Sequence, residues 1–261
     1  NTMIDAGEGC NPSFLDVDGD SLQDMIIGNY GYYQTGANYL SELSYYKNTG
    51  TKSNPSFSLI TLDFASVSTL SLSGIHPCFG DIDGDSDLDM IIGEEGGELF
   101  LFTNSAGQGN PVIFSSISAG YMGIDVGQYS APQLVDVNRD GLPDLLIGER
   151  NGNLNYFENT GTKTIAEYTL ATDSFGRINI VEPLAVTGYS VPMLVELDTI
   201  PKYSLLVGTE SGKFYLYQNI EGNLDGSFSL IDTLFMDIWE GIRSTVDAGD
   251  INNDGNPELI I

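Results

Sequence analysis

Histidine, cysteine and basic residues are all scarce in this chain of 261 residues. One histidine, His76, argues against catalysis by a Ser–His or Cys–His set. Two cysteines, Cys10 and Cys78, are too few to define a disulfide framework; they could pair or be small buried side chains. The chain has only 9 Lys and Arg against 37 Asp and Glu, which gives a net charge of −28. Nucleic acid and an anionic membrane surface are therefore poor partners.

Long apolar runs are absent as well. No stretch approaches the ~20 residues of a membrane span, and no signal-peptide pattern is present, so we expect no direct membrane insertion. The sequence begins at Asn1 rather than at Met, and we expect it to be a mature or trimmed piece linked to further domains.

A repeat dominates what is present. The segment "DIDGDSDLDMIIG" has counterparts in "DVDGDSLQDMIIG", "DVNRDGLPDLLIG", "ELDTIPKYSLLVG" and "DINNDGNPELII", roughly 55 to 65 residues apart. Four residues before each segment stands a proline, replaced by Val246 in the last copy. The repeats span approximately 10–74, 75–129, 130–189, 190–243 and 244–261, the last one incomplete.

Each repeat reads as four short strands. A brief apolar stretch precedes the acidic segment, an aliphatic run such as "LLIG" follows it, and a tight turn leads to an alternating aromatic strand such as "LNYFEN". Four strands per unit predict an all-β fold, a β-propeller of four-stranded blades in a single region, 1–261. A β-solenoid is the alternative. About four and a half blades should not close into a ring, so we expect an arc of a larger propeller.

Oxygen-bearing side chains recur at fixed places in four of the five acidic loops. Numbered from the first acid, positions 1, 3, 5 and 9 carry only Asp, Asn or Glu, and position 7 would offer its main-chain carbonyl. The residues at positions 1, 3, 5, 7 and 9 are Asp16, Asp18, Asp20, Leu22 and Asp24; Asp81, Asp83, Asp85, Asp87 and Asp89; Asp136, Asn138, Asp140, Leu142 and Asp144; and Asp250, Asn252, Asp254, Asn256 and Glu258.

Such all-oxygen loops suit Ca²⁺, a hard cation that accepts several flexible carboxylates. An EF-hand is excluded because its position 12 needs a bidentate Glu, and isoleucine stands there in every intact copy. The alternative is a set of solvated acidic loops. The copy at Glu196 has Ile200 and Lys202 at positions 5 and 7, so we expect about four Ca²⁺ sites and an empty loop at Glu196.

The pattern D-x-[DN]-x-[DN]-x-x-x-[DE], clearest in "FGDIDGDSDLDMIIG" and "LVDVNRDGLPDLLIG", resembles FG-GAP or VCBS repeats of integrin α-subunit-like β-propellers. The resemblance implies calcium loops between the first and second strands, and a seven-bladed ring in many relatives. The phrase "YYKNTGTKSNPSFSLI" also resembles secreted or surface proteins of bacteria of the Bacteroidota type. An extracellular or cell-surface location is therefore expected.

Candidate ligand-binding residues cluster in loops expected on the rim opposite the acidic loops. A long connection in the first blade contains several tyrosines. In three copies, the residue three positions before the repeated proline, or before Val246, is also large. The alternative is that these side chains only pack against one another. The candidates are Tyr30, Tyr32, Tyr33, Tyr39, Tyr129, Tyr189 and Arg243. We expect this face to bind a protein or glycan ligand, without catalysis. The alternatives are a polysaccharide hydrolase or lyase using Glu94, Glu95 or Glu149, and a structural spacer.

Overall fold

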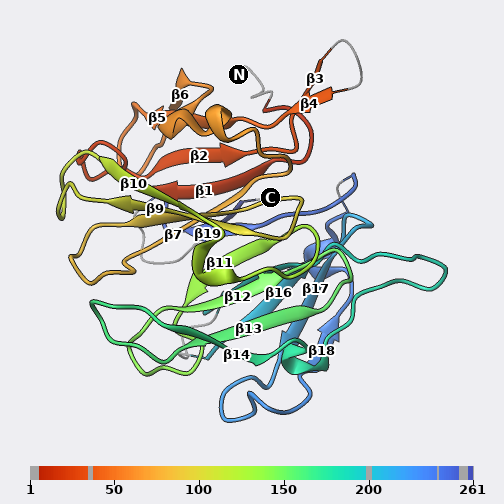
Figure 1. The fold of residues 1–261 in the computed structure, drawn as a ribbon. Helices are drawn as coiled ribbons and strands as arrows, with labels where there is room; N and C mark the ends of the chain where they lie inside the picture. Colours follow the sequence, from red (N-terminus) through yellow and green to blue (C-terminus); the bar gives the residue numbers. More distant parts are fainter. Residues whose placement is uncertain (1–5, 35–37, 198–201, 240, 253–257, 261) are drawn as a thin grey trace.

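The computed structural model describes residues 6–34, 38–197, 202–239, 241–252 and 258–260, and folds most of them into antiparallel strands. Four complete blades surround a common axis (Figure 1). Their strands are β1 (Asn11–Leu15), β2 (Asp24–Gly28), β5 (Leu43–Asn48) and β6 (Phe57–Thr61); β7 (His76–Gly80), β8 (Asp89–Gly93), β9 (Leu99–Asn104) and β10 (Phe114–Ala119); β11 (Ala131–Val135), β12 (Asp144–Gly148), β13 (Leu154–Asn159) and β14 (Tyr168–Thr172); and β15 (Val191–Val195), β16 (Ser204–Gly208), β17 (Phe214–Gln218) and β18 (Ser229–Asp232). The all-β propeller predicted from the sequence is confirmed.

The remaining elements are short. The incomplete fifth repeat forms a two-stranded sheet, β19 (Asp247–Gly249) with β20 (Glu258–Ile260), and the first-blade insertion forms a hairpin, β3 (Tyr32–Gln34) with β4 (Asn38–Leu40). Four 3₁₀ helices follow the outer strands: η1 (Phe64–Leu70), η2 (Tyr121–Gly123), η3 (Phe175–Arg177) and η4 (Phe235–Asp237). In the described part of the chain, no helix is long and apolar enough to cross a membrane.

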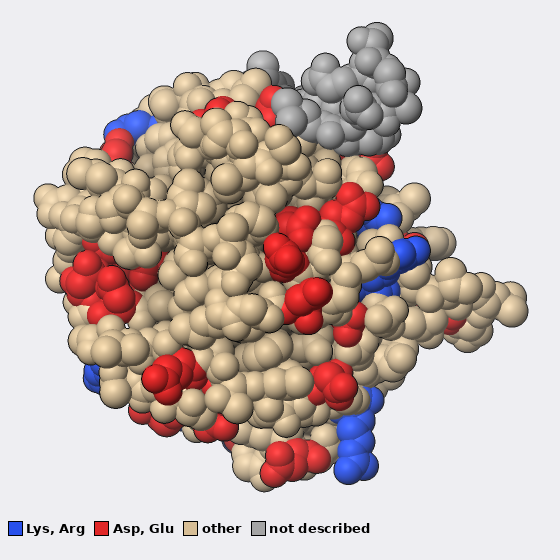
Figure 2. Space-filling model, viewed as in Figure 1, with Lys and Arg blue, Asp and Glu red and all other residues tan. Residues whose placement is uncertain are grey.

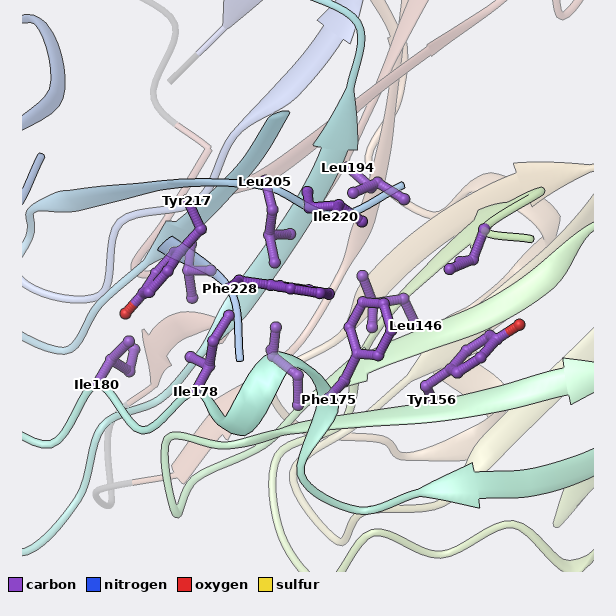
Figure 3. Packing of buried hydrophobic residues seen from close by; sticks show 13 residues of the cluster. Leu146, Tyr156, Phe175, Ile178, Ile180, Leu194, Leu205, Tyr217, Ile220 and Phe228 are labelled. Carbon is purple, nitrogen blue, oxygen red and sulfur yellow. The ribbon is translucent and has the colours of Figure 1, made fainter. Parts of the chain in front are cut away.

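Burial follows the strand order within each blade. The aliphatic second strands are buried throughout, whereas the outer strands β6, β10, β14 and β18 are mostly exposed. Neighbouring blades pack face to face, and Figure 3 shows one such core, in which Phe175 and Phe228 meet edge to face at 4.8 Å. Each fully buried side chain of this size contributes about 1.5–3 kcal/mol. The apolar second strand therefore anchors each blade.

The ring closes through the fifth repeat. The inner strands contact one another in the order β1, β7, β11, β15 and β19, and β19 also contacts β1. The Phe14 backbone N–H donates to Asp247 Oδ2 (3.1 Å), which repeats the bond from Leu194 N–H to Gln133 Oε1 (2.7 Å) between the third and fourth blades. In the described residues, β19 of the two-stranded fifth repeat fills the gap between β15 and β1, where the sequence predicted an open arc.

The five inner strands enclose a central channel of about 260 Å³. His76 and Cys78 both lie along it and are buried. Cys10 is exposed, and the two sulfurs are not joined in a disulfide. The question of pairing that the sequence left open is thus answered in favour of separate thiols.

In each of the four complete blades, the second strand ends at a glycine because the next blade passes close to it. A Cβ on Gly28, Gly93, Gly148 or Gly208 would lie closer than 3.0 Å to the carbonyl oxygen of Ile75, Ser130, Ser190 or Ser244, respectively. These oxygens belong to the segment that leads into the next inner strand. The glycine therefore sets how closely successive blades approach.

We expect Gly148→Ala to destabilise the protein by about 1–3 kcal/mol or more, because the added methyl group forces two backbones apart. Chemical denaturation monitored by circular dichroism measures the change. Gly222→Ala is the matched control: its Cβ would meet no atom within 4 Å, although its φ of +69° makes a side chain mildly strained. Equal losses in the two variants would refute the close-approach explanation.

Candidate metal centres and the opposite face

The first carboxylate of each intact loop organises the loop backbone. Asp16 accepts the N–H groups of Gly19, Asp20 and Ser21, at 2.8 to 3.1 Å. Asp81 accepts the N–H groups of Gly84 and Ser86, and Asp136 accepts those of Asp140 and Gly141. Positions 4 and 6 both have positive φ in all three loops, which wraps the chain around the first acid.

The acid at position 9 joins the loop to two strands. Asp24 Oδ1 accepts the Asn48 N–H (2.7 Å), while its Oδ2 accepts the Val17 N–H (3.1 Å) and the Tyr45 hydroxyl (3.0 Å). Asp89 and Asp144 accept the same pair of backbone N–H groups, and all three side chains are buried. Burial, opposed by these hydrogen bonds, raises the pKa of both Asp89 and Asp144 to about 6.

In each of the first two loops, three carboxylates lie close to one another. One oxygen from each of Asp16, Asp18 and Asp24 lies within 4.8 Å of the others, and so do oxygens of Asp81, Asp83 and Asp85. A cation among them would replace repulsion by attraction. Three of the sequence-predicted donors of each of the first two loops are thus brought together.

Several oxygens in these loops have no hydrogen-bond donor although they are buried. They are Oδ1 of Asp18, Asp83 and Asn252, all at position 3, and Oδ1 of Asp87 at position 7. Asp87 is only 6 % exposed, and its other oxygen accepts the Gly107 N–H (2.7 Å). Because an unpaired buried acceptor costs about 1–3 kcal/mol, the donor set fits a cation that would satisfy these atoms. The side chain of Asp87 is therefore a further candidate metal ligand. The sequence predicted a ligand role only for the main-chain carbonyl of this residue.

The first loop already contains a cation from the chain itself. The Lys47 ammonium, on β5, contacts Asp18 and lies 3.0 Å from Asp20 Oδ2. This hydrogen bond lowers the pKa of Asp20, whereas burial raises the pKa of Asp83 in the second loop. Thr103 occupies the place of Lys47 in the second blade. The first and second loops are therefore electrostatically different despite their similar sequences.

The third and fourth loops are linked by an ion pair. Arg139, at position 4 of the third loop, donates to Glu196 (2.9 Å) and to Glu221 (3.3 Å). In the third loop Asn138 Oδ1 already accepts the Asp140 N–H (2.9 Å), and its amide donates to Glu158 (3.2 Å). Glu196, the first acid of the degenerate loop, is thus held by a neighbouring blade.

Only part of the fifth loop is described. Glu258 accepts the Ile251 N–H (2.9 Å) and a bond from the Asn252 amide, as expected for position 9. Asp250 is described, but Asp254 and Asn256 lie outside the described residues.

On the opposite side of the ring, three tyrosines surround one arginine. The Arg243 guanidinium lies 4.0 Å from the ring centroid of Tyr189, 5.5 Å from that of Tyr30 and 5.6 Å from that of Tyr129. Tyr129, Tyr189 and Arg243 have positive φ, as do Gly9 and Gly74 at the same place in the first two repeats. Tyr30 fills the space beside these two glycines.

This arrangement answers part of the sequence prediction. Tyr30, Tyr129, Tyr189 and Arg243 do come together around the axis, although Tyr129 is buried. Tyr32, Tyr33 and Tyr39 belong to β3 and β4, and their side chains lie outside the described part.

The carboxylates considered for catalysis have structural partners. Glu149 is buried and accepts the side-chain amides of Asn151, Asn153 and Asn155. Glu94 accepts the N–H groups of Gly96 and Glu98, and Glu95 accepts the Tyr30 hydroxyl (3.1 Å). Each carboxylate therefore braces a turn or a contact between blades.

We expect the apo protein, kept in chelator, to become more stable as the pH falls from 7 to 5. The folded carboxyls of Asp89, Asp144 and Asp247 have a pKa raised by burial to about 6, against a usual value of 3.8, so the folded state takes up protons that the unfolded state does not. His76 opposes the trend, because burial lowers its pKa to about 3.

Urea denaturation at each pH measures this effect. His76→Asn, which introduces the residue found at the same register position in the first blade (Asn11), should steepen the rise. A wild-type stability that falls steadily from pH 7 to pH 5 would contradict the assignment.

Comparison with known families agrees with this geometry. A family model described as an FG-GAP-like repeat matches residues 16–92, from the first acid of the first loop into β8, and so includes two complete aspartate loops. No curated protein matches the chain. The resemblance inferred from the sequence is confirmed for residues 16–92, which match the FG-GAP-like repeat and lie within a β-propeller of four complete blades.

Proposed function

We propose that the protein is a calcium-stabilised β-propeller that presents a protein- or glycan-binding face. The observation that carries the calcium proposal is the recurrence of an unpaired, buried oxygen at position 3 of three different loops. A structural accident would not select the same position in Asp18, Asp83 and Asn252. Ca²⁺ tolerates irregular cages of carboxylate, amide and carbonyl oxygens, which is the donor set of these loops.

The loops should differ in affinity. The second loop combines five carboxylates with two unpaired oxygens and has no basic residue at the Lys47 position, so we propose it as the tightest site. The first loop is weakened by Lys47. We propose that the loop at Glu196 binds no metal, because Arg139 pairs with its first acid and Ser204 replaces the acid at position 9.

The binding face is proposed to lie opposite these loops, around Tyr30, Tyr129, Tyr189 and Arg243. Non-glycine residues with positive φ are strained by roughly 1–3 kcal/mol, and such strain concentrates at functional sites. Three of these residues are strained at equivalent positions. An extracellular or cell-surface location is proposed with it, because extracellular modules use weak calcium sites with dissociation constants of about 10⁻⁴–10⁻³ M.

We expect calcium to raise the thermal midpoint, with each occupied site adding about 2.7 kcal/mol at a hundredfold excess over its dissociation constant. Asp83→Asn/Asp85→Asn should remove part of this gain by weakening the second loop. Differential scanning fluorimetry in chelator and in calcium measures both. The control, Glu98→Gln/Asp225→Asn, removes two exposed acids elsewhere and should leave the gain intact. A wild-type midpoint equal in chelator and calcium would exclude the function proposed.

Replacing the internal cation tests the difference between the loops. We expect Lys47→Thr, which copies Thr103 of the second blade, to lower stability in chelator, because Asp18 and Asp20 lose their counter-charge. In calcium the same variant should gain more than the wild type, since the ion no longer competes with an ammonium group. Calcium titration by calorimetry measures the change in affinity. Arg177→Gln, at an exposed position of η3, is the control; an unaltered calcium affinity in Lys47→Thr would disprove the competition.

A further inference from the structure

The connection between the third and fourth blades carries an exposed apolar tip. Residues 173–190 link β14 to β15, whereas residues 120–130 suffice between β10 and β11. In Figure 1 this teal segment projects from the right side of the molecule. Its tip, Pro183–Val186, places four apolar residues in succession, and all four are exposed, Val186 to 90 %. Such a run is unfavourable for a soluble surface unless it contacts something.

The tip is held in a defined shape. Ala185 N–H donates to the Glu182 carbonyl (3.0 Å), which closes a turn in which Leu184 has a φ of +77°. At its base, Ile180 N–H donates to the Gly152 carbonyl (3.0 Å) and Gly188 N–H to the Arg150 carbonyl (2.9 Å). The apolar side chains are therefore presented on a braced turn.

Two more large apolar side chains lie on the adjoining loop. Trp239 is 67 % exposed and Ile242 is 76 % exposed. The Trp239 indole donates to the Ser211 carbonyl (2.8 Å), and the Ser211 hydroxyl donates to Glu182 (2.9 Å), so the two loops meet at this serine. We call Leu184, Val186, Trp239 and Ile242 the apolar ridge.

A small acidic pocket opens beside the ridge. It has a volume of about 90 Å³, and its lining includes Glu182 and Glu210. A cation of the chain already lies next to this pocket. The Lys213 ammonium group is 2.8 Å from Glu182 and 5.8 Å from the Trp239 ring centroid. A carboxylate beside an aromatic face is a combination that attracts cations.

We propose that the apolar ridge is a docking surface for a polypeptide segment in which apolar side chains flank a lysine or arginine. The ridge lies on the two loops that also carry Tyr189 and Arg243 but contains neither residue, so this inference goes beyond the proposed binding face. The apolar side chains would cover the ridge, and the basic group would enter the field of Glu182 and Glu210. Figure 2 shows Asp and Glu scattered over the visible face and a group of Lys and Arg at its right edge. The net charge of −28 favours a basic partner over a second copy of the chain, which would carry the same negative charge.

Fluorescence anisotropy with a labelled synthetic peptide that alternates leucine and lysine tests the proposal, in calcium and at physiological salt. We expect saturable binding that weakens at least about tenfold in Leu184→Ser/Trp239→Ser, as for the loss of central anchor residues. Leu59→Ser/Leu230→Ser, which alters aliphatic residues exposed to 49 % on outer strands, is the matched control and should bind normally. Glu210→Gln should weaken binding, and Glu98→Gln should not.

The competing occupants give different results. Equal binding by the ridge variant and the wild type would overturn the proposal, as would equal binding of a leucine–glutamate peptide. Ridge-dependent binding to phosphatidylcholine vesicles without peptide binding would replace the partner by a lipid surface, and ridge-dependent self-association would replace it by a second copy. Calcium-dependent melting of the same variants should match the wild type, so a failed docking test leaves the calcium proposal standing.

Discussion

Mutual repulsion among carboxylates is the constraint on which the acidic side of this propeller depends. Two like charges about 4 Å apart repel by about 1 kcal/mol in water and about 4 kcal/mol near a protein surface, and three oxygens lie within 4.8 Å of one another in each of the first two loops. The chain answers this repulsion in three ways. Backbone N–H groups point at positions 1 and 9, Lys47 places one positive charge in the first loop, and the second loop keeps unpaired oxygens that suit a divalent ion.

The framework of the blades does not itself require the acids. The fourth blade lacks the donor pattern, yet β15 to β18 pair in the same order as the strands of the other blades, and its second strand is equally buried. Packing between blades and the glycine at the end of each second strand are common to all four. The acidic donor pattern is thus a feature that an individual blade can lack while the ring persists.

The sequence predicted those features that repeat along the chain. Blade number, strand order and the facing donors of Asp16, Asp18 and Asp24 follow from a register visible in the letters alone. It could not predict Lys47 in the first loop, because β5 reaches that loop only after the blade folds. Ring closure by Asp247 and the meeting of Tyr30 with Arg243 join residues from opposite ends of the chain.

The two sides of the propeller therefore have different roles in this account: one holds cations that stiffen the ring, and the other presents strained and apolar side chains to a partner. The stiffening is the central claim. Equilibrium dialysis against calcium, with bound metal measured by mass spectrometry, tests it most directly. The account predicts more than one Ca²⁺ per chain at extracellular concentrations, with the second loop filled first. A chain that retains no calcium under these conditions would contradict it.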